Sequence, residues 1–456
     1  MEDLEALAGR SKVVCPDRVV TPHGVAVGAG VWVDDGVIRD VITDGSPYPD
    51  VPVIAMPGAV VMPGIVDAHH HVEQPFAKAV SFGEPAQMWK RLWMPLASIL
   101  TPETAYVAAK WTFLECLRGG FTTIVDSSQR KAVLNEQVMR AADEVGIRLV
   151  ASTGINDRFD DSAPAPDAVD EVLGAHLELC ATFDRVTPSV ACGTVQSTSG
   201  PMLGAVARFA AEAGVVFQVH ANEHTGEIQH SLEHFHRRPL EHLHDHGALG
   251  PHTLIAHATL VTPSELTLLA DTGTAVSYNP VASAWKGNAV ATALEMIERG
   301  IRVGLGTDAT RNDAFRLLDA AEFAQRLTVG LATDDFGVGS GFIWVEAGTA
   351  GGAEVAGIGD LTGTISAGQA ADLLVLDAFQ LETMPSHDLE WELVRFFDRT
   401  AITAVLVGGE VVSVKGQPTR VDADAVLSDE LQLALDTMEA SPIEVVHGPS
   451  WHHRPR

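Results

Sequence analysis

Four histidines and one aspartate stand at the ends of short apolar segments of this chain: His69, His71, His220, His257 and Asp308. His69 and His71 are two residues apart, so in an extended chain both side chains point to one side, while His70 points to the other. Neutral imidazoles together with a carboxylate are typical ligands of zinc, iron or manganese. An isolated His-x-His pair is common by chance. Its occurrence together with other ligand-type residues, each at the end of an apolar segment, predicts a metal site.

Most of the remaining histidines have a simpler interpretation. The chain has 19 histidines, and ten of them lie between His220 and His257 inclusive. Those on the intervening loop and helix are expected on the surface, with His224 the one that adjoins the predicted site. Histidine type alone therefore does not predict a ligand.

The apolar segments that carry the site alternate with helical stretches. Eight of them are short and β-branched, as buried parallel strands are: 61–68, 121–126, 147–153, 185–191, 215–220, 252–256, 273–278 and 301–306. Thr101-Pro102-Glu103 and the pair Thr262 and Glu265 are helix-start signals between strands. Eight strand–helix units predict a (β/α)8 TIM barrel, with ligands on the rim where the strands end. A doubly wound open sheet is the alternative, which the position of the ligand residues disfavours.

Both ends of the chain have a different pattern. The first 60 residues consist of short β segments with Gly and Asp-Asp-Gly turns, and a matching all-β pattern returns at 371–377 and 402–414. We expect one small β-sandwich assembled from both chain ends. The predicted boundaries are 1–60 and 363–420 for the sandwich, 61–362 for the barrel, and 421–456 for a C-terminal helix and tail.

Composition limits the classes of partner. Thirty basic against sixty acidic side chains give a formal charge of −30, which disfavours nucleic acid because its phosphates are repelled. No apolar run reaches the ~18 residues of a membrane span, and the acidic N-terminus is unlike a secretory signal. Four scattered cysteines without C-x-x-C spacing predict neither a disulfide scaffold nor a thiolate zinc site. We expect a cytoplasmic protein with a small-molecule substrate, no nucleic acid and no membrane.

Several ordered motifs resemble those of the amidohydrolase superfamily, in its cytosine deaminase/chlorohydrolase-type branch. The resemblance covers about residues 50–415, and its motifs are MPGIVDAHHH (62–71), LRGGFTTIVD (117–126), HANE (220–223), IAHATLVT (255–262), SYNPVAS (277–283), LGTDA (305–309) and GTISAGQAADLLVLD (363–377). It implies that His69, His71, His220 and Asp308 bind one divalent metal ion, zinc in the first place and otherwise iron or manganese. Relatives with two metals bridge them by a lysine after the fourth strand. No lysine lies between Lys131 and Lys286, so we expect a single ion.

The same resemblance implies catalytic roles for Glu223, His257 and Asp308. A metal ion of this kind lowers the pKa of a bound water from ~16 to ~7. His257 would orient that water, and Asp308 is a second acceptor for its proton. Glu223 would protonate a ring nitrogen and help ammonia depart.

The substrate is less well defined by the sequence. Gln74, in the run H-x-H-x-x-Q, is the best candidate for a substrate contact, because an amide bonds to a heterocycle edge or an amidine. The run resembles guanine deaminases and formiminoglutamate deiminases, but the arginine that both families carry after the fourth strand is missing here. Trp89 and Trp93, four apart on a predicted helix, form an aromatic wall or simply pack. The run SAWKGN (283–288) replaces the usual S-N-x-x-L-x-x-G, so Trp285 and Asn288 mark an altered specificity.

These observations predict an aminohydrolase that acts on the C–NH2 group of a small N-heterocycle or amidine. Two alternatives stay open: a chlorohydrolase or cyclic amidohydrolase with the same metal, and a metal-binding scaffold without catalysis. By analogy with the family we expect a homo-oligomer.

Overall fold

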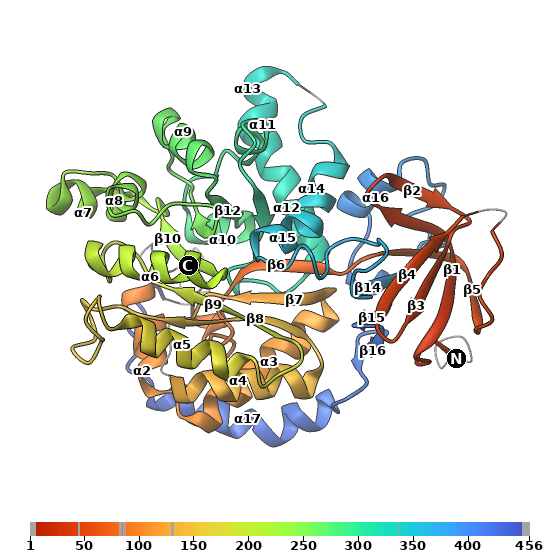
Figure 1. Ribbon diagram of the computed structural model, residues 1–456, viewed down its shortest axis with the longest axis horizontal. Coiled ribbons are helices and arrows are strands. Elements are labelled where there is room, and N and C mark those ends of the chain that lie inside the picture. The colour runs from red at the N-terminus through yellow and green to blue at the C-terminus, as the bar shows by residue number, and fades with distance from the viewer. Residues whose placement is uncertain are drawn as a thin grey trace, which may run out of the picture.

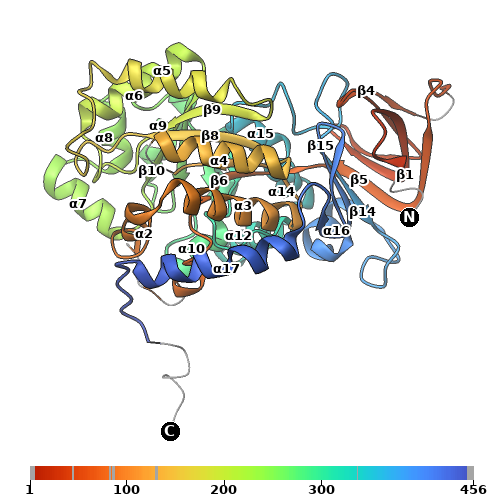
Figure 2. The same cartoon turned by 90° about the horizontal axis from the view of Figure 1, so that it is seen from below.

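The computed structural model describes residues 6–43, 46–81, 84, 88–128, 132–335 and 337–448. Two bodies are visible in Figures 1 and 2, a large barrel surrounded by helices and a smaller β domain beside it. Residues 449–456 of the predicted C-terminal tail lie outside the described residues, as does Lys131. None of the described helices has the length and apolar character needed to cross a membrane.

The larger body is built on eight parallel strands, in the order β13-β12-β11-β10-β9-β8-β7-β6. Their bounds are β6 (Ile65–His70), β7 (Phe121–Asp126), β8 (Arg148–Gly154), β9 (Val186–Ala191), β10 (Val216–Ala221), β11 (Thr253–His257), β12 (Ala275–Tyr278) and β13 (Val303–Leu305). The last strand approaches the first, because the N–H of Asp308 donates to the carbonyl of His69 over 2.9 Å. The predicted TIM barrel is therefore confirmed, nearly closed, with each strand within two residues of its predicted position except the first.

The first predicted strand, 61–68, combines two strands. β5 (Val53–Pro63) belongs to the smaller domain, and β6 begins at Ile65. Between them, Gly64 passes so close to Thr122 that a Cβ on it would lie 2.1 Å from Thr122 Oγ1. One apolar run therefore serves two sheets, which periodicity alone does not reveal.

Helices cover the outside of the barrel and follow its strands. Their bounds are α2 (Trp93–Ile99), α3 (Pro102–Arg118), α4 (Ala132–Val145), α5 (Val169–Cys180), α6 (Gly200–Ala213), α7 (Thr225–Phe235), α8 (Pro239–Asp245), α9 (Pro263–Thr272), α10 (Pro280–Lys286), α11 (Ala293–Glu298), α12 (Ala314–Gln325), α13 (Leu331–Thr333), α14 (Gly341–Gly348) and α15 (Ala350–Val355). Two predicted starts are confirmed, since Thr101 caps α3 and Thr262 with Glu265 forms a capping box on α9.

The smaller domain unites both chain ends, as predicted. Its strands are β1 (Ser11–Thr21), β2 (Gly24–Val27), β3 (Gly30–Asp34), β4 (Val37–Ile42), β5, β14 (Leu373–Asp377), β15 (Ile402–Val407), β16 (Glu410–Val414) and β17 (Gln417–Pro418). They form one mixed sheet of nine strands in which β14 pairs with β5. The chain ends thus meet in a continuous sheet, with α16 (Leu389–Arg395) between β14 and β15.

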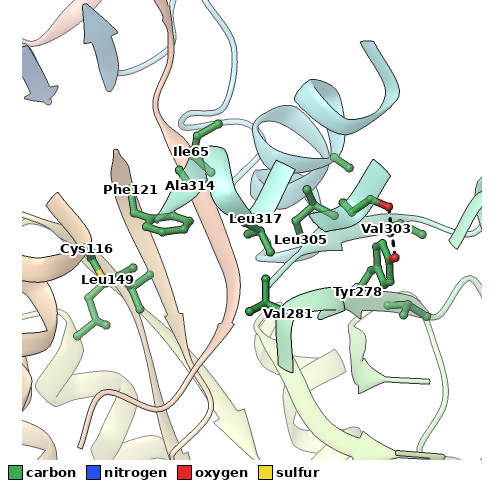
Figure 3. Close-up of a cluster of buried hydrophobic side chains, with 14 of the residues drawn as sticks. Ile65, Cys116, Phe121, Leu149, Tyr278, Val281, Val303, Leu305, Ala314 and Leu317 are labelled. Carbon is green, nitrogen blue, oxygen red and sulfur yellow. Dashed lines mark hydrogen bonds between the residues drawn. The ribbon is translucent and has the colours of Figure 1, made fainter. Parts of the chain in front are cut away.

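The main core lies between barrel strands and the helices outside them. Figure 3 shows part of it, where Ile65 and Phe121 meet Ala314 and Leu317 of α12. Tyr278, fully buried beside them, donates its hydroxyl proton to the carbonyl of Ala321 over 3.3 Å. This packing holds strand β12 against α12, and so fixes the rim position from which the next loop begins.

A buried ion pair joins the two bodies. Arg148, at the start of β8, donates to Asp372 beside β14 through Nε at 2.8 Å and Nη2 at 3.1 Å. Both side chains are almost fully buried, with 6% and 1% of their surface exposed. A second contact is made by α17 (Ala423–Ala440), which packs along α3 (Figure 2). Two separate contacts therefore fix the smaller domain and the C-terminal helix to the barrel.

We predict that Asp372→Asn lowers the free energy of unfolding by about 3–5 kcal/mol, because it leaves the Arg148 guanidinium buried without its counter-charge. Urea unfolding monitored by circular dichroism measures this change. The matched control is Glu212→Gln, which removes the exposed partner of Arg208 on α6 and should cost less than about 1 kcal/mol. Equal effects of the two substitutions would contradict the structural role assigned to the buried pair.

Candidate active site

The predicted ligand residues all lie at one rim of the barrel, where the strands end. His69 is near the end of β6 and His71 directly follows it, His220 is the penultimate residue of β10, and Asp308 follows β13. The order of the parallel strands places β13 beside β6 through the Asp308–His69 backbone bond. Residues separated by more than 200 positions in the sequence are thereby brought together, as the fold class requires.

Ligand atoms of these four residues converge. Asp308 Oδ1 lies 3.5 Å from His69 Nε2 and 3.4 Å from His71 Nε2, and His71 Nε2 lies 3.3 Å from His220 Nε2. His69 Nε2 is fully buried and has no hydrogen-bond partner among the described residues. A buried nitrogen lone pair facing other ligand-type atoms is what a metal ion would satisfy. The donor set therefore fits a divalent ion.

The protonation of the histidines suits this arrangement. Burial lowers the pKa of both His69 and His220 to about 3, so both imidazoles are neutral near pH 7. Burial also lowers the pKa of His71, but the hydrogen bond and charge of Asp308 outweigh it and raise that pKa overall. His220 Nδ1 lies 3.0 Å from the carbonyl oxygen of Gly193. That contact orients the ring with Nε2 toward the other ligand residues.

Glu223 and His257 form the neighbouring wall of the site. Glu223 follows β10 by two residues, and its Oε2 lies 3.8 Å from Nε2 of His257, the last residue of β11. Both side chains are buried, and burial lowers the pKa of His257 to about 3. His257 and Asp308 have left-handed backbone φ angles of 76° and 52°. Strained non-glycine backbone of this kind is concentrated at functional sites.

Lys286 is a member of the site that the sequence did not reveal. Its Nζ donates to Glu223 Oε1 over 2.9 Å and to Asp308 Oδ2. Burial raises the pKa of Glu223, but the charge of Lys286 outweighs it and holds that pKa well below its ordinary value. The segment SAWKGN (283–288), which departs from the family's pattern, contains this cation between Trp285 and Asn288. In a chain with only seven lysines, that position is the signal by which Lys286 could have been found.

A cavity of about 300 Å³ opens beside these residues. Its lining includes Gln74, Trp93, Trp285 and Lys286, so three of the predicted substrate contacts border it. Asn288 contacts the site as well, with its Nδ2 3.4 Å from Glu223 Oε1.

Trp89 differs from the prediction. It belongs to the 3-10 turn η2 (Met88–Lys90), whereas Trp93 begins α2, so the two do not share one helix. Trp89 packs on Phe159 with a ring separation of 6.1 Å, under the ammonium of Lys90. These are the contacts of a packing residue, the simpler of the two interpretations.

The other histidines of the region have structural contacts. His224 accepts the N–H of Glu227 through Nδ1 over 3.0 Å and so caps α7. His230 stacks on His234, and His242 stacks on Phe235. Among the described residues, the groups that could hold an ion consist of His69, His71, His220, His257 and Asp308 only. These contacts agree with the expectation that a histidine in this region is not a metal ligand by virtue of its residue type alone.

The chain belongs to the amidohydrolase family, whose model matches residues 60–412. Among its relatives, a 5-methylthioadenosine/S-adenosylhomocysteine deaminase of Natronomonas pharaonis is 31% identical over 376 residues, 81% of this chain and 85% of the relative. A 5'-deoxyadenosine deaminase of Methanopyrus kandleri is 27% identical over 91% of this chain and 96% of its own. The predicted family is confirmed, and these relatives support hydrolysis of a C–N bond other than a peptide bond.

Solved structures share the whole fold. An adenosine deaminase from Xanthomonas campestris with bound zinc superimposes with a TM-score of 0.86, at 22% identity, over 94% of this chain and 99% of its own. An atrazine chlorohydrolase from Arthrobacter aurescens complexed with zinc superimposes with a TM-score of 0.82, at 21% identity, over 93% of this chain and 100% of its own. At these identities the likeness establishes the fold, and both neighbours hold zinc.

We predict that Glu227→Gln removes a pH dependence of stability. Glu227 accepts the N–H of Glu223 through Oε2 over 2.9 Å, and burial raises its pKa from 4.5 to about 8. The folded state then binds an extra proton, so the free energy of unfolding falls as pH rises from about 4.5 to about 8. The substituted amide keeps the acceptor oxygen without the charge, so the urea midpoint of the variant should change less across this window. Glu233→Gln, exposed on the same helix, is the control and should behave like the wild type.

Proposed function

We propose that this chain is a zinc-dependent aminohydrolase that releases ammonia from the amidine-like C–NH2 group of an adenosine-type nucleoside. The observation that carries the proposal is the position of Glu223. This buried carboxylate, 3.8 Å from His257, adjoins the converging ligand atoms of His69, His71, His220 and Asp308. An acid–base group beside such a ligand set is what hydrolysis of a ring amidine requires.

In the proposed mechanism His69, His71, His220 and Asp308 hold one ion. When bound, the ion supplies hydroxide as a nucleophile near neutral pH. Glu223 is ionised in the free site, because Lys286 holds its pKa low. It can therefore accept a proton from the attacking water and deliver it to the ring nitrogen next to the attacked carbon. His257 faces the same space and donates a hydrogen bond to the oxygen that is added.

The nucleoside class is supported by the named relatives and by the cavity. Trp93 and Trp285 offer aromatic surface for a planar ring, and Gln74 has both an amide donor and an acceptor for its edge. The cavity of about 300 Å³ is at the small end of ligand sites. Zinc is supported by the nitrogen-rich donor set and by its presence in the structural neighbours.

The decisive experiment measures ammonia release from the zinc-loaded protein with adenosine, 5'-deoxyadenosine, 5-methylthioadenosine and S-adenosylhomocysteine. Glu223→Gln should lower kcat by about 10²–10⁴, because it removes the proton carrier. Bound zinc, measured by atomic absorption, should stay at the wild-type level, since Glu223 is not among the proposed ligands.

A chelator should abolish turnover, and added zinc should restore it.

Chloride release from a chlorotriazine, or opening of a cyclic amide, without deamination of any aminopurine would favour the alternative hydrolases. Near-normal kcat in a zinc-replete Glu223→Gln variant would remove Glu223 from the mechanism. A protein that binds no stoichiometric zinc would contradict the whole proposal.

Lys286→Met should move the acidic limb of the pH profile of kcat/KM to higher pH. Lys286 lowers the pKa of Glu223, so its removal raises that pKa, and Glu223 must be ionised to accept the proton of water. Lys78→Met is the control, because Lys78 also lines the cavity but pairs with Glu115 at 2.7 Å. Its acidic limb should stay in place. An unshifted limb in Lys286→Met would show that this lysine does not set the ionisation of Glu223.

A further inference from the structure

His257 stands in a position from which it could enter the ligand set. One group of converging ligand atoms consists of His69, His71 and Asp308, and another of His69, His220 and His257. The ring of His257 lies 5.3 Å from that of His69 and 5.5 Å from that of His220. Distance alone therefore does not show whether His257 binds the ion or donates a hydrogen bond. The distinction depends on which ring nitrogen of His257 carries the proton.

His220 and His257 are held in opposite tautomers. The Nδ1 of His220 lies 3.0 Å from the carbonyl oxygen of Gly193, and a carbonyl only accepts. Its proton therefore belongs on Nδ1, which leaves the Nε2 lone pair for an ion. The Nδ1 of His257 lies 3.1 Å from the amide nitrogen Nδ2 of Asn279, and an amide nitrogen only donates. The proton of a neutral His257 therefore belongs on Nε2.

The orientation of the Asn279 amide follows from Ser277. Ser277 is fully buried, and its Oγ lies 2.8 Å from Asn279 Oδ1. This is the one acceptor that the described residues offer to that hydroxyl proton. Reversing the amide would leave the serine proton unsatisfied, at the cost of a buried donor without a partner. The orientation with Nδ2 toward His257 therefore satisfies both groups.

Gly306 makes room for this network. A Cβ on Gly306 would lie 2.3 Å from Asn279 Oδ1, 2.6 Å from Ser277 Oγ and 2.9 Å from His69 Cβ. Asn279 itself is almost fully buried and directly precedes α10, with its carbonyl accepting the N–H of Ser283 over 3.0 Å. The end of β12 and the glycine at position 306 thus leave the Asn279 amide a fixed place between Ser277 and His257.

We propose that Asn279 is the positioning residue that keeps the proton of His257 on Nε2, so that His257 faces the reaction as a hydrogen-bond donor and stays out of the metal ligand set. The inference rests on the proposed function for its catalytic consequence, but the tautomer is independent of activity. Without this amide, the two neutral imidazoles of His220 and His257 would be equivalent candidates for the same ion.

The test compares Asn279→Asp in two backgrounds. A carboxylate only accepts, so it would draw the proton to Nδ1 of His257 and leave Nε2 without a donor. We expect kcat to fall about 10²-fold, the usual effect of losing one donor to a developing charge, while KM and bound zinc stay unchanged. In a His257→Gln background the side-chain amide donates whatever stands at position 279, so Asn279→Asp should cause no further fall. Equal losses in both backgrounds would overturn the proposal, because Asn279 would then act without His257.

Nitrogen-15 NMR of histidine-labelled protein provides a readout that needs no substrate. The resonances that His257→Gln removes should report a proton on Nε2 in the wild type, with and without zinc, and Asn279→Asp should move it to Nδ1. A wild-type His257 with its proton on Nδ1 would overturn the proposal. If the tautomer is as expected but no nucleoside is deaminated, the proposed function fails and the role of Asn279 in excluding His257 from the ligand set remains.

Discussion

The N–H of Asp308 donates a 2.9 Å hydrogen bond to the carbonyl of His69, and this bond joins the last strand of the barrel to the first. Beside it, Asp67 accepts from the N–H of Thr307 over 2.9 Å and from the Thr307 hydroxyl. Together these bonds bring the Asp308 carboxylate to the histidines of β6. The convergence of ligand atoms is therefore a consequence of barrel closure, and the backbone around Asp308 adopts a left-handed φ of 52° to achieve it.

The charged groups buried in the site are balanced by one another. Lys286 lies between the carboxylates of Glu223 and Asp308, so two buried negative charges share one positive charge. The imidazoles of His69, His220 and His257 avoid the cost of burial by remaining neutral. A divalent ion would add the positive charge that this arrangement can accommodate. Because both rings are neutral, each carries a single proton, and the hydrogen-bond partner at Nδ1 decides its position. A carbonyl at His220 and an amide at His257 therefore give similar rings different roles.

Much of the fold and the ligand set was open to prediction from local patterns. Buried parallel strands are continuous β-branched runs with ligand-type residues at their ends, and β7 to β13 were located by that pattern. The first strand does not follow from this pattern, because the apolar run around Gly64 passes from one sheet into another without any break in hydropathy. The spacing of four predicts Trp89 and Trp93 on one helix, whereas Trp89 lies in a 3-10 turn that ends before α2 begins at Trp93.

The sequence by itself determined the family, the barrel and the identity of His69, His71, His220, His257, Glu223 and Asp308 as candidates, because residue type and position at a strand end are local properties. It did not determine which nitrogen of each histidine carries its proton, since that depends on the carbonyl of Gly193 and the amide of Asn279. It also left Lys286 unnoticed, because a lysine in a loop resembles any surface cation until α10 directs it to Glu223 and Asp308. Contacts between strands far apart in the chain decide these features, and only the tertiary structure creates them.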